Sequence, residues 1–66
     1  MKIITYISEY YTKRDMLKKM QVDIDNWLVY YLDEKTGEKW VSEYLFSERQ
    51  GGGPPQLRQI EKFPWE

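Results

Sequence analysis

Apolar residues recur at three- and four-residue spacings from residue 3 to about residue 20, and this period predicts an amphipathic helix. Two acid–base pairs four residues apart, Glu9 with Lys13 and Asp15 with Lys19, would each stabilise that helix by about 0.2–0.5 kcal/mol. The apolar stripe consists of Ile3, Ile4, Ile7, Tyr10, Tyr11, Leu17 and Met20.

The two ends of this segment are less regular. Ile3, Thr5 and Ile7 are β-branched and alternate along the chain, as in a strand. Such a strand would lead into a shorter helix with Thr12 as its N-cap. Both interpretations of the first residues stay open. Beyond the helix, Val22–Asn26 is mostly polar and is predicted to be a linker.

The clearest pattern is a β-hairpin over about residues 27–47. Trp27–Leu32 is an apolar run of strand length, Asp33–Gly37 supplies turn residues, and Glu38–Ser47 has the alternation of a returning strand. Gly37 can take the left-handed conformation that a short hairpin loop needs. One face of the returning strand carries Trp40, Tyr44 and Phe46.

A glycine- and proline-rich loop follows over residues 50–55. Its three glycines allow positive φ or a close backbone approach, and its two prolines fix an extended path. Gln56–Phe63 predicts a weaker third strand, because Leu57 and Ile60 do not share a strand face. The prediction is therefore an α+β domain, with an N-terminal helix packed on a small antiparallel sheet formed by the hairpin and the third strand.

The composition is that of one small domain spanning residues 1–66. A chain of this length buries only about 60% of the surface that its unfolded form exposes. Because the chain has no cysteine, its stability must come from packing, which three Trp, six Tyr and two Phe can supply. We expect Trp27 and Trp40 in the core and Trp65 at an interface, where tryptophan is enriched.

Little in the sequence favours catalysis. The absence of His and Cys removes the commonest general base, the thiol nucleophile and the usual zinc ligands. Asp33, Glu34 and Glu38 cluster at the hairpin turn, where a solvated turn is the simplest interpretation. The glycines run into Pro54 and Pro55 with no lysine after them, so they match no phosphate-binding motif. We expect no enzyme activity, no cofactor, no metal and no small-molecule substrate.

Two functions stay open as alternatives: binding of nucleic acid and a structural role in a homodimer. The net charge is −1, so no field over the whole domain attracts nucleic acid or anionic membrane. A small nucleic-acid-binding module would have to use the basic patch, although a solvated helix face is the preferred interpretation of it. A structural domain could form a homodimer through a strand edge, and we expect a monomer or a weak homodimer. The basic patch comprises Lys13, Arg14, Lys18 and Lys19.

The sequence has no apolar run of 18 residues and no signal-peptide pattern. We therefore expect no association with a membrane and a location in the cytoplasm.

The paired tryptophan strands are followed by Ser47-Glu48 and then by a Gly-Gly-Gly-Pro-Pro-Gln-Leu run. This combination resembles the immunity protein 27 family of bacterial polymorphic toxin systems over residues 27–60, about half of the chain. The chain departs from the family pattern at Leu45, where a proline is usual, and at Gln50, where a histidine is frequent. The matching residues are Trp27, Tyr30, Tyr31, Asp33, Gly37, Trp40, Tyr44, Ser47, Glu48, Gly51, Gly52, Gly53, Pro54, Pro55, Gln56 and Leu57.

The resemblance implies a non-enzymatic antidote that binds a cognate toxin domain and blocks its active site or its substrate path. The high aromatic content, the missing catalytic residues and the size of the domain agree with this role. The predicted partner-binding residues are Asp33, Glu34, Glu38, Glu48, Arg49, Gly51, Gly52, Gly53, Pro54, Pro55 and Trp65.

Overall fold

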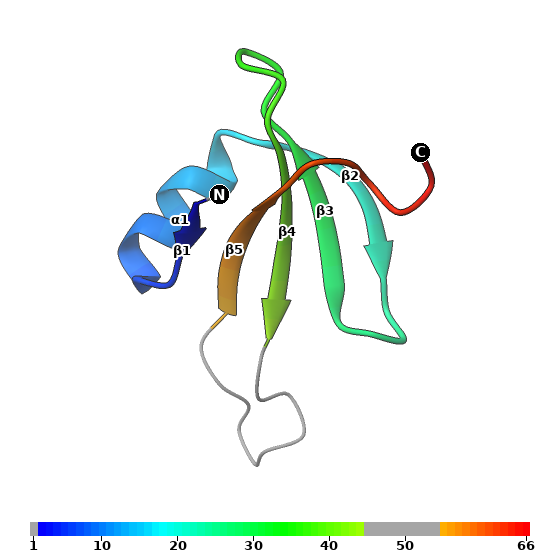
Figure 1. Ribbon diagram of the computed structural model, residues 1–66. Helices are drawn as coiled ribbons and strands as arrows, with labels where there is room; N and C mark the ends of the chain where they lie inside the picture. Colours follow the sequence, from blue (N-terminus) through cyan, green and yellow to red (C-terminus); the bar gives the residue numbers. More distant parts are fainter. Residues whose placement is uncertain (1, 45–54) are drawn as a thin grey trace.

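The computed structural model describes residues 2–44 and 55–66, which form an α+β fold with a short helix and a five-stranded antiparallel sheet (Figure 1). The strand order in the sheet is β1-β5-β4-β3-β2. Residues 45–54, which include most of the predicted glycine-proline loop, lie outside the described part of the chain. The elements are β1 (Ile3–Ile4), α1 (Ile7–Asp15), β2 (Lys18–Asp23), β3 (Leu28–Leu32), β4 (Lys39–Tyr44) and β5 (Pro55–Ile60).

Strands β3 and β4 form the antiparallel hairpin in the middle of the sheet. Tyr31 lies opposite Trp40 in its register. The turn closes through the amide of Gly37, which donates to the Asp33 carbonyl at 2.7 Å, while the Asp33 amide donates to the Glu38 carbonyl at 2.8 Å. Gly37 has a φ of +80°, the left-handed conformation that the turn residues predict.

Successive residues of the central strands point to opposite faces, so the core is divided into two clusters. On one face, α1 packs its buried Tyr10 against Tyr31, Trp40 and Leu57. On the other face, the C-terminal segment crosses the sheet (Figure 1). The cluster on that face is formed by Tyr30, Val41 and Phe63.

The helix is much shorter than the predicted span of residues 3–20. Ile3 and Ile4 form β1, which pairs with β5, so the strand interpretation is correct for these two residues, whereas Ile7 begins the helix. The expected cap is wrong, because Tyr6 is the N-cap residue and makes no side-chain capping bond. Thr12 lies inside the helix and donates its hydroxyl to the Ser8 carbonyl at 3.0 Å.

The second departure from prediction is β2, whose residues were predicted partly as helix and partly as linker. It pairs with β3, with Lys18 opposite Leu32 and Val22 opposite Val29. Five of its six residues are exposed, because it is the last strand of the sheet. A strand that is exposed on both faces shows no alternation of apolar and polar residues, and lysines are common on such edges. The sequence pattern therefore could not reveal it.

The predicted third strand over residues 56–63 begins one residue earlier and ends at Ile60. It lies between β1 and β4 in the sheet, and Leu57 is fully buried. Beyond Ile60 the chain turns, which brings the ring of Phe63 to 6.0 Å from that of Tyr30. In the described part of the chain, no helix is long and apolar enough to span a membrane.

Candidate functional site

The β3–β4 turn carries three of the predicted partner-binding residues, and the first of them, Asp33, is buried. Its Oδ1 accepts the amide of Lys35 at 3.0 Å and that of Thr36 at 3.4 Å. Its Oδ2 accepts Lys13 Nζ at 3.2 Å. Loss of hydration acts to raise the pKa of Asp33, but the Lys35 amide and Lys13 outweigh it, so the pKa is lowered. The Asp33 carboxylate therefore joins the turn to α1.

The other two acids of this turn differ from each other. Glu38 is half-buried and lies 3.8 Å from Lys13 Nζ through its Oε1. Glu34 is exposed and makes no ion pair with a described residue. The turn thus brings Asp33 and Glu38 together around Lys13, and it leaves Glu34 as its freely available acid.

The remaining predicted residues do not gather at this turn. Pro55 is buried at the start of β5, at the other end of the hairpin. Trp65 is 45% exposed and lies on the face opposite α1, with its ring stacked 4.5 Å from that of Phe63 and 5.3 Å from that of Tyr30. The loop residues Glu48, Arg49, Gly51, Gly52, Gly53 and Pro54 lie outside the described residues.

Trp65 is held in place by the residue that follows it. Glu66 accepts Lys39 Nζ at 2.6 Å and 2.8 Å through its two carboxylate oxygens, and it accepts the Phe63 amide at 2.6 Å. These contacts, with the hydrogen bond from Lys39 the largest, lower the pKa of Glu66. The C-terminal segment is therefore tied to β4, and the Trp65 ring packs against Phe63 and Tyr30 while remaining partly exposed.

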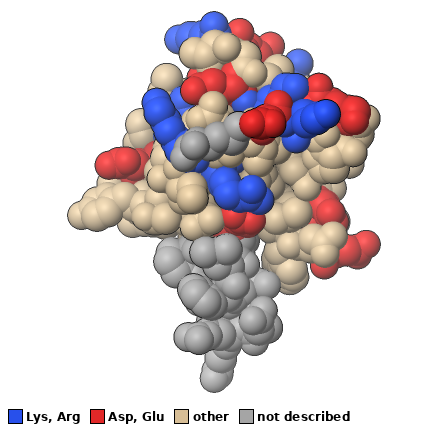
Figure 2. Space-filling model, viewed as in Figure 1, with Lys and Arg blue, Asp and Glu red and all other residues tan. Residues whose placement is uncertain are grey.

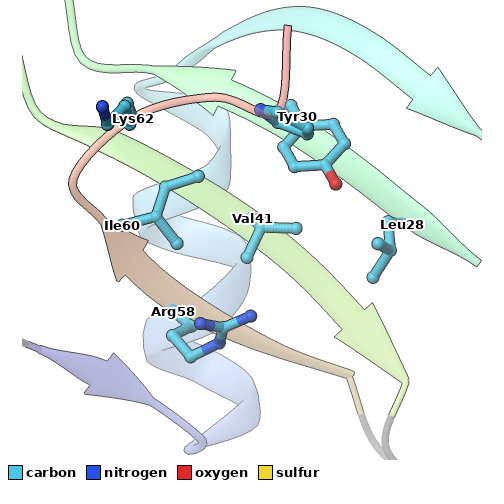
Figure 3. A pocket seen from close by; sticks show the side chains of 7 residues that line it. Leu28, Tyr30, Val41, Arg58, Ile60 and Lys62 are labelled. Carbon is cyan, nitrogen blue, oxygen red and sulfur yellow. The ribbon is translucent and has the colours of Figure 1, made fainter. Parts of the chain in front are cut away.

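Beside this segment, the sheet has a solvent-open recess of about 210 Å³ (Figure 3). Figure 3 shows the Tyr30 hydroxyl and the Arg58 guanidinium on either side of Val41. The Tyr30 hydroxyl makes no hydrogen bond with a described residue. We call this feature the sheet-face recess. Its lining residues are Leu28, Tyr30, Val41, Arg58, Ile60, Lys62 and Pro64.

Arg58 is positioned by a neighbouring carboxylate on the same face. Glu43 Oε1 accepts Arg58 Nε at 3.0 Å and Gln56 Nε2 at 2.8 Å. Burial acts to raise the pKa of Glu43, but these two hydrogen bonds outweigh it and the pKa is lowered. Because Glu43 engages Nε, the two terminal nitrogens of the guanidinium stay available to a binding partner.

The recess offers chemistry for recognition. Its floor is aliphatic, and its polar groups are one hydroxyl and the cations of Arg58 and Lys62. Within residues 2–44 and 55–66, no cluster of three carboxylates could hold a metal ion. A shallow apolar surface with a few polar groups is suited to bind a protein side chain.

Trp27 corrects a prediction, because it is 63% exposed instead of buried in the core. It is the last residue of the β2–β3 turn, one position before β3 begins at Leu28. Asp23 organises the turn by accepting the amide of Asn26 at 3.3 Å and its side-chain amide at 2.9 Å. Asp23, Asp25 and Asn26 are turn-forming residues, and this signal could have separated Trp27 from the strand.

The basic patch is largely engaged within the protein. Lys13 Nζ contacts Asp33 and lies 5.2 Å from the centre of the Trp40 ring. Arg14 lies over the Tyr11 ring, 4.7 Å from its centre. Lys18 and Lys19 are exposed on β2. The structure therefore does not gather the four cations into one surface for phosphates.

These features define a small α+β domain with a solvent-open recess and partly exposed aromatic residues. The sequence model of the immunity protein 27 family matches residues 7–61, and the chain belongs to this family. The match extends from α1 to just beyond β5, so the resemblance noted in the sequence is confirmed. No curated protein and no solved structure gives a significant match to the chain.

Proposed function

We propose that the protein binds and neutralises the cognate toxin domain of a bacterial polymorphic toxin system, without catalysing a reaction. The observation that carries this proposal is the family match over residues 7–61. The described surface supports it, because it combines a solvent-open recess with half-exposed aromatic residues. Aromatic residues and arginine are the side chains that most often dominate binding energy at protein interfaces. The neutralisation would take place in the cytoplasm of the producing cell.

The proposed contact surface is the face of the sheet opposite α1. There the terminal nitrogens of Arg58 can bind a carboxylate of the toxin, while the exposed part of Trp65 adds apolar contact area. An interface of about 800 Å² per partner would also reach neighbouring loops. Within this proposal Asp33 holds the β3–β4 turn and makes no direct contact. The other proposed contacts are Glu34, Glu38, Glu48, Arg49, Gly51, Gly52, Gly53, Pro54 and Pro55.

Co-expression tests the proposal. The toxin domain encoded beside the gene is induced in a sensitive host, with and without this protein, and surviving colonies are counted. We expect survival with the protein and death without it. The Trp40→Ala variant, which loses a core residue, is the matched control and should fail to rescue. Equal killing in the presence of the folded protein would contradict the proposal.

The geometry gives the two alternatives less support. For nucleic acid, Lys13 is paired with Asp33 and Arg14 lies over an aromatic ring. A binder of this kind would show affinity that falls steeply with salt. For a homodimer, β2 is an exposed edge, but it carries lysines that disfavour strand pairing with a second copy. We propose a monomer, and sedimentation at increasing concentration would reveal a dimer.

A further inference from the structure

The β2–β3 turn holds a bulky residue in an unfavourable backbone conformation. Trp27 has a φ of +58°, and within residues 2–44 and 55–66 it is the one residue other than glycine with a positive φ. For a large L-residue this conformation costs free energy, whereas glycine or asparagine adopts it readily. Positions that keep such a cost are enriched at sites where proteins bind or react.

The side chain at this position contributes little to the core, so packing does not explain the choice of tryptophan. Trp27 is 63% exposed and Ile24, at the start of the same turn, is 78% exposed. Neither belongs to the two core clusters nor is packed against them. Together they form part of the lining of a shallow apolar hollow of about 210 Å³, with Val22 beside them.

The backbone of the turn is held by hydrogen bonds, which suits an anchor. Asp23 binds both the amide and the side chain of Asn26, and the Trp27 amide donates to the Ile24 carbonyl at 3.3 Å. A turn whose backbone is ordered before binding loses less backbone entropy when a partner covers it.

The charge around Trp27 indicates the chemistry of the partner. Asp23 and Asp25 flank the exposed apolar residues, and neither forms an ion pair with a described residue. On the face shown in Figure 2, the turn at the lower right carries red and tan atoms without blue ones beside them. A surface of this kind is complementary to an apolar pocket with a basic rim.

We propose that Trp27 is an anchor that inserts into an apolar pocket with a basic rim on the toxin domain. This inference rests on the proposed function and adds a second contact point to it. Leu28 lines both the hollow at this turn and the sheet-face recess, so a single partner of ordinary interface size can reach both. The strain at Trp27 is then a stability cost that binding offsets.

The proposal predicts that replacing Trp27 weakens toxin binding without lowering the stability of the fold. Trp27→Asn removes the ring and relieves the backbone, so its melting temperature should stay within about 3 °C of the parent protein or rise. Its affinity for the purified toxin domain encoded beside the gene, measured by calorimetry, should fall at least about 30-fold. Trp27→Phe is the matched control. It keeps an aromatic ring and the same backbone demand, and should lose less than about tenfold.

The basic rim is tested by charge reversal at the β2–β3 turn and at a distant position. Asp25→Lys should weaken binding about tenfold at low salt, and the deficit should shrink at high salt. Glu9→Lys makes the charge reversal at an exposed position of α1, away from the β2–β3 turn (Figure 1), and should have the smaller effect. An unchanged affinity for Asp25→Lys, or a larger loss for Glu9→Lys, would overturn the basic rim.

The outcomes separate this inference from the proposed function. Parent protein and Trp27→Asn binding equally well would overturn the anchor and leave neutralisation intact. A marked fall in the melting temperature of Trp27→Asn would show that the ring is structural, which also overturns the anchor. If the parent protein does not bind the toxin domain at all, both proposals fall together.

Discussion

Lys13 Nζ lies 3.2 Å from Asp33 Oδ2, and this contact links α1 to the β3–β4 turn across 20 positions of the sequence. The same carboxylate accepts two backbone amides of its own turn. Asp33, which was predicted to bind a partner, thus forms contacts within the domain that stabilise its fold. It shows how a short chain uses polar groups to fix its hairpin and its helix together.

The Asp33 contacts predict a clear difference between neighbouring acids. Asp33→Ala removes the acceptor for the Lys35 and Thr36 amides and leaves Lys13 without its nearest partner, so the urea midpoint should fall. Glu34→Ala, at the exposed neighbouring position, should change the free energy of unfolding by less than about 0.5 kcal/mol. Equal midpoints for the two variants would show that the turn does not depend on Asp33.

Acid should destabilise the fold through three carboxylates. The pKa values of Asp33, Glu43 and Glu66 lie below their ordinary values of 3.8 for Asp and 4.5 for Glu. Each therefore stabilises the folded state fully above its unfolded pKa, and the contribution is lost as the pH falls through the folded pKa. Urea unfolding followed by tryptophan fluorescence should show a free energy that decreases from pH 5 toward about pH 2.

Glu43→Gln provides the control for that titration. It keeps the size of the side chain and removes one of the three titrating groups, so the decrease toward acid pH should be smaller. A free energy of unfolding that rises as the pH falls would contradict the assignment of these pKa shifts.

The buried pair of hydroxyl groups predicts that a double-mutant cycle will give non-additive changes in the free energy of unfolding. Tyr10 Oη and Ser42 Oγ lie 2.6 Å apart in the core, and each is the other's partner. Tyr10→Phe should cost about 1–2 kcal/mol because it leaves the Ser42 hydroxyl buried without a partner. The double variant with Ser42→Ala should cost less than the sum of the single variants.

Tyr11 offers a matched control for this cycle. It follows Tyr10 on α1 but is 44% exposed, so Tyr11→Phe should change stability by less than about 0.5 kcal/mol. Additive free energies in the Tyr10 and Ser42 cycle would mean that the two hydroxyls do not interact in solution.

Trp40 is the residue on which the core depends most. It is 1% exposed and packs among Tyr10, Tyr31 and Leu57. Trp40→Ala should cost about 3–5 kcal/mol. A domain of this size has a total stability of roughly 3–10 kcal/mol, so circular dichroism should show a largely unfolded variant. Trp65→Ala removes a half-exposed ring and should remain folded. A folded Trp40→Ala variant would show that the core lies elsewhere.

Glu66 should hold the C-terminal segment on the sheet. Glu66→Ala removes the acceptor for Lys39 and for the Phe63 amide. Hydrogen exchange at the Phe63 amide should accelerate, whereas the amides of β4 should exchange at nearly the parent rate. Trp65 fluorescence should shift to longer wavelength as its ring becomes more exposed. Unchanged exchange at Phe63 would show that the aromatic stack alone holds the segment.

The sequence predicted the hairpin and Trp40 in the core because both depend on local alternation and on one large buried ring. It also predicted the α+β class, which needs only one helix and an antiparallel sheet. The helix boundaries were wrong because Ile3 and Ile4 pair with β5, more than 50 residues away, and no local period records such a partner.

The candidate site was harder to predict for a different reason. Trp27 looked like the first residue of a buried strand, and only the turn bonds of Asp23 place it outside the sheet. Arg58 reaches the recess because Glu43 on β4 holds its Nε, a contact set by the strand register. The sequence predicted a solvated turn at Asp33, but the carboxylate pairs with Lys13 on α1. The positions of Arg58 and Asp33 depend on contacts between elements distant in the sequence, whereas the Trp27 turn is set by local turn-forming residues.

Neutralisation of the toxin by direct binding can be measured in a stoichiometric titration. The purified toxin domain encoded beside the gene is held at a fixed concentration while the protein is added, and the residual toxin activity is measured. We expect the toxin activity to fall linearly and to disappear near one equivalent of protein. Full toxin activity in the presence of excess, correctly folded protein would rule out neutralisation by binding.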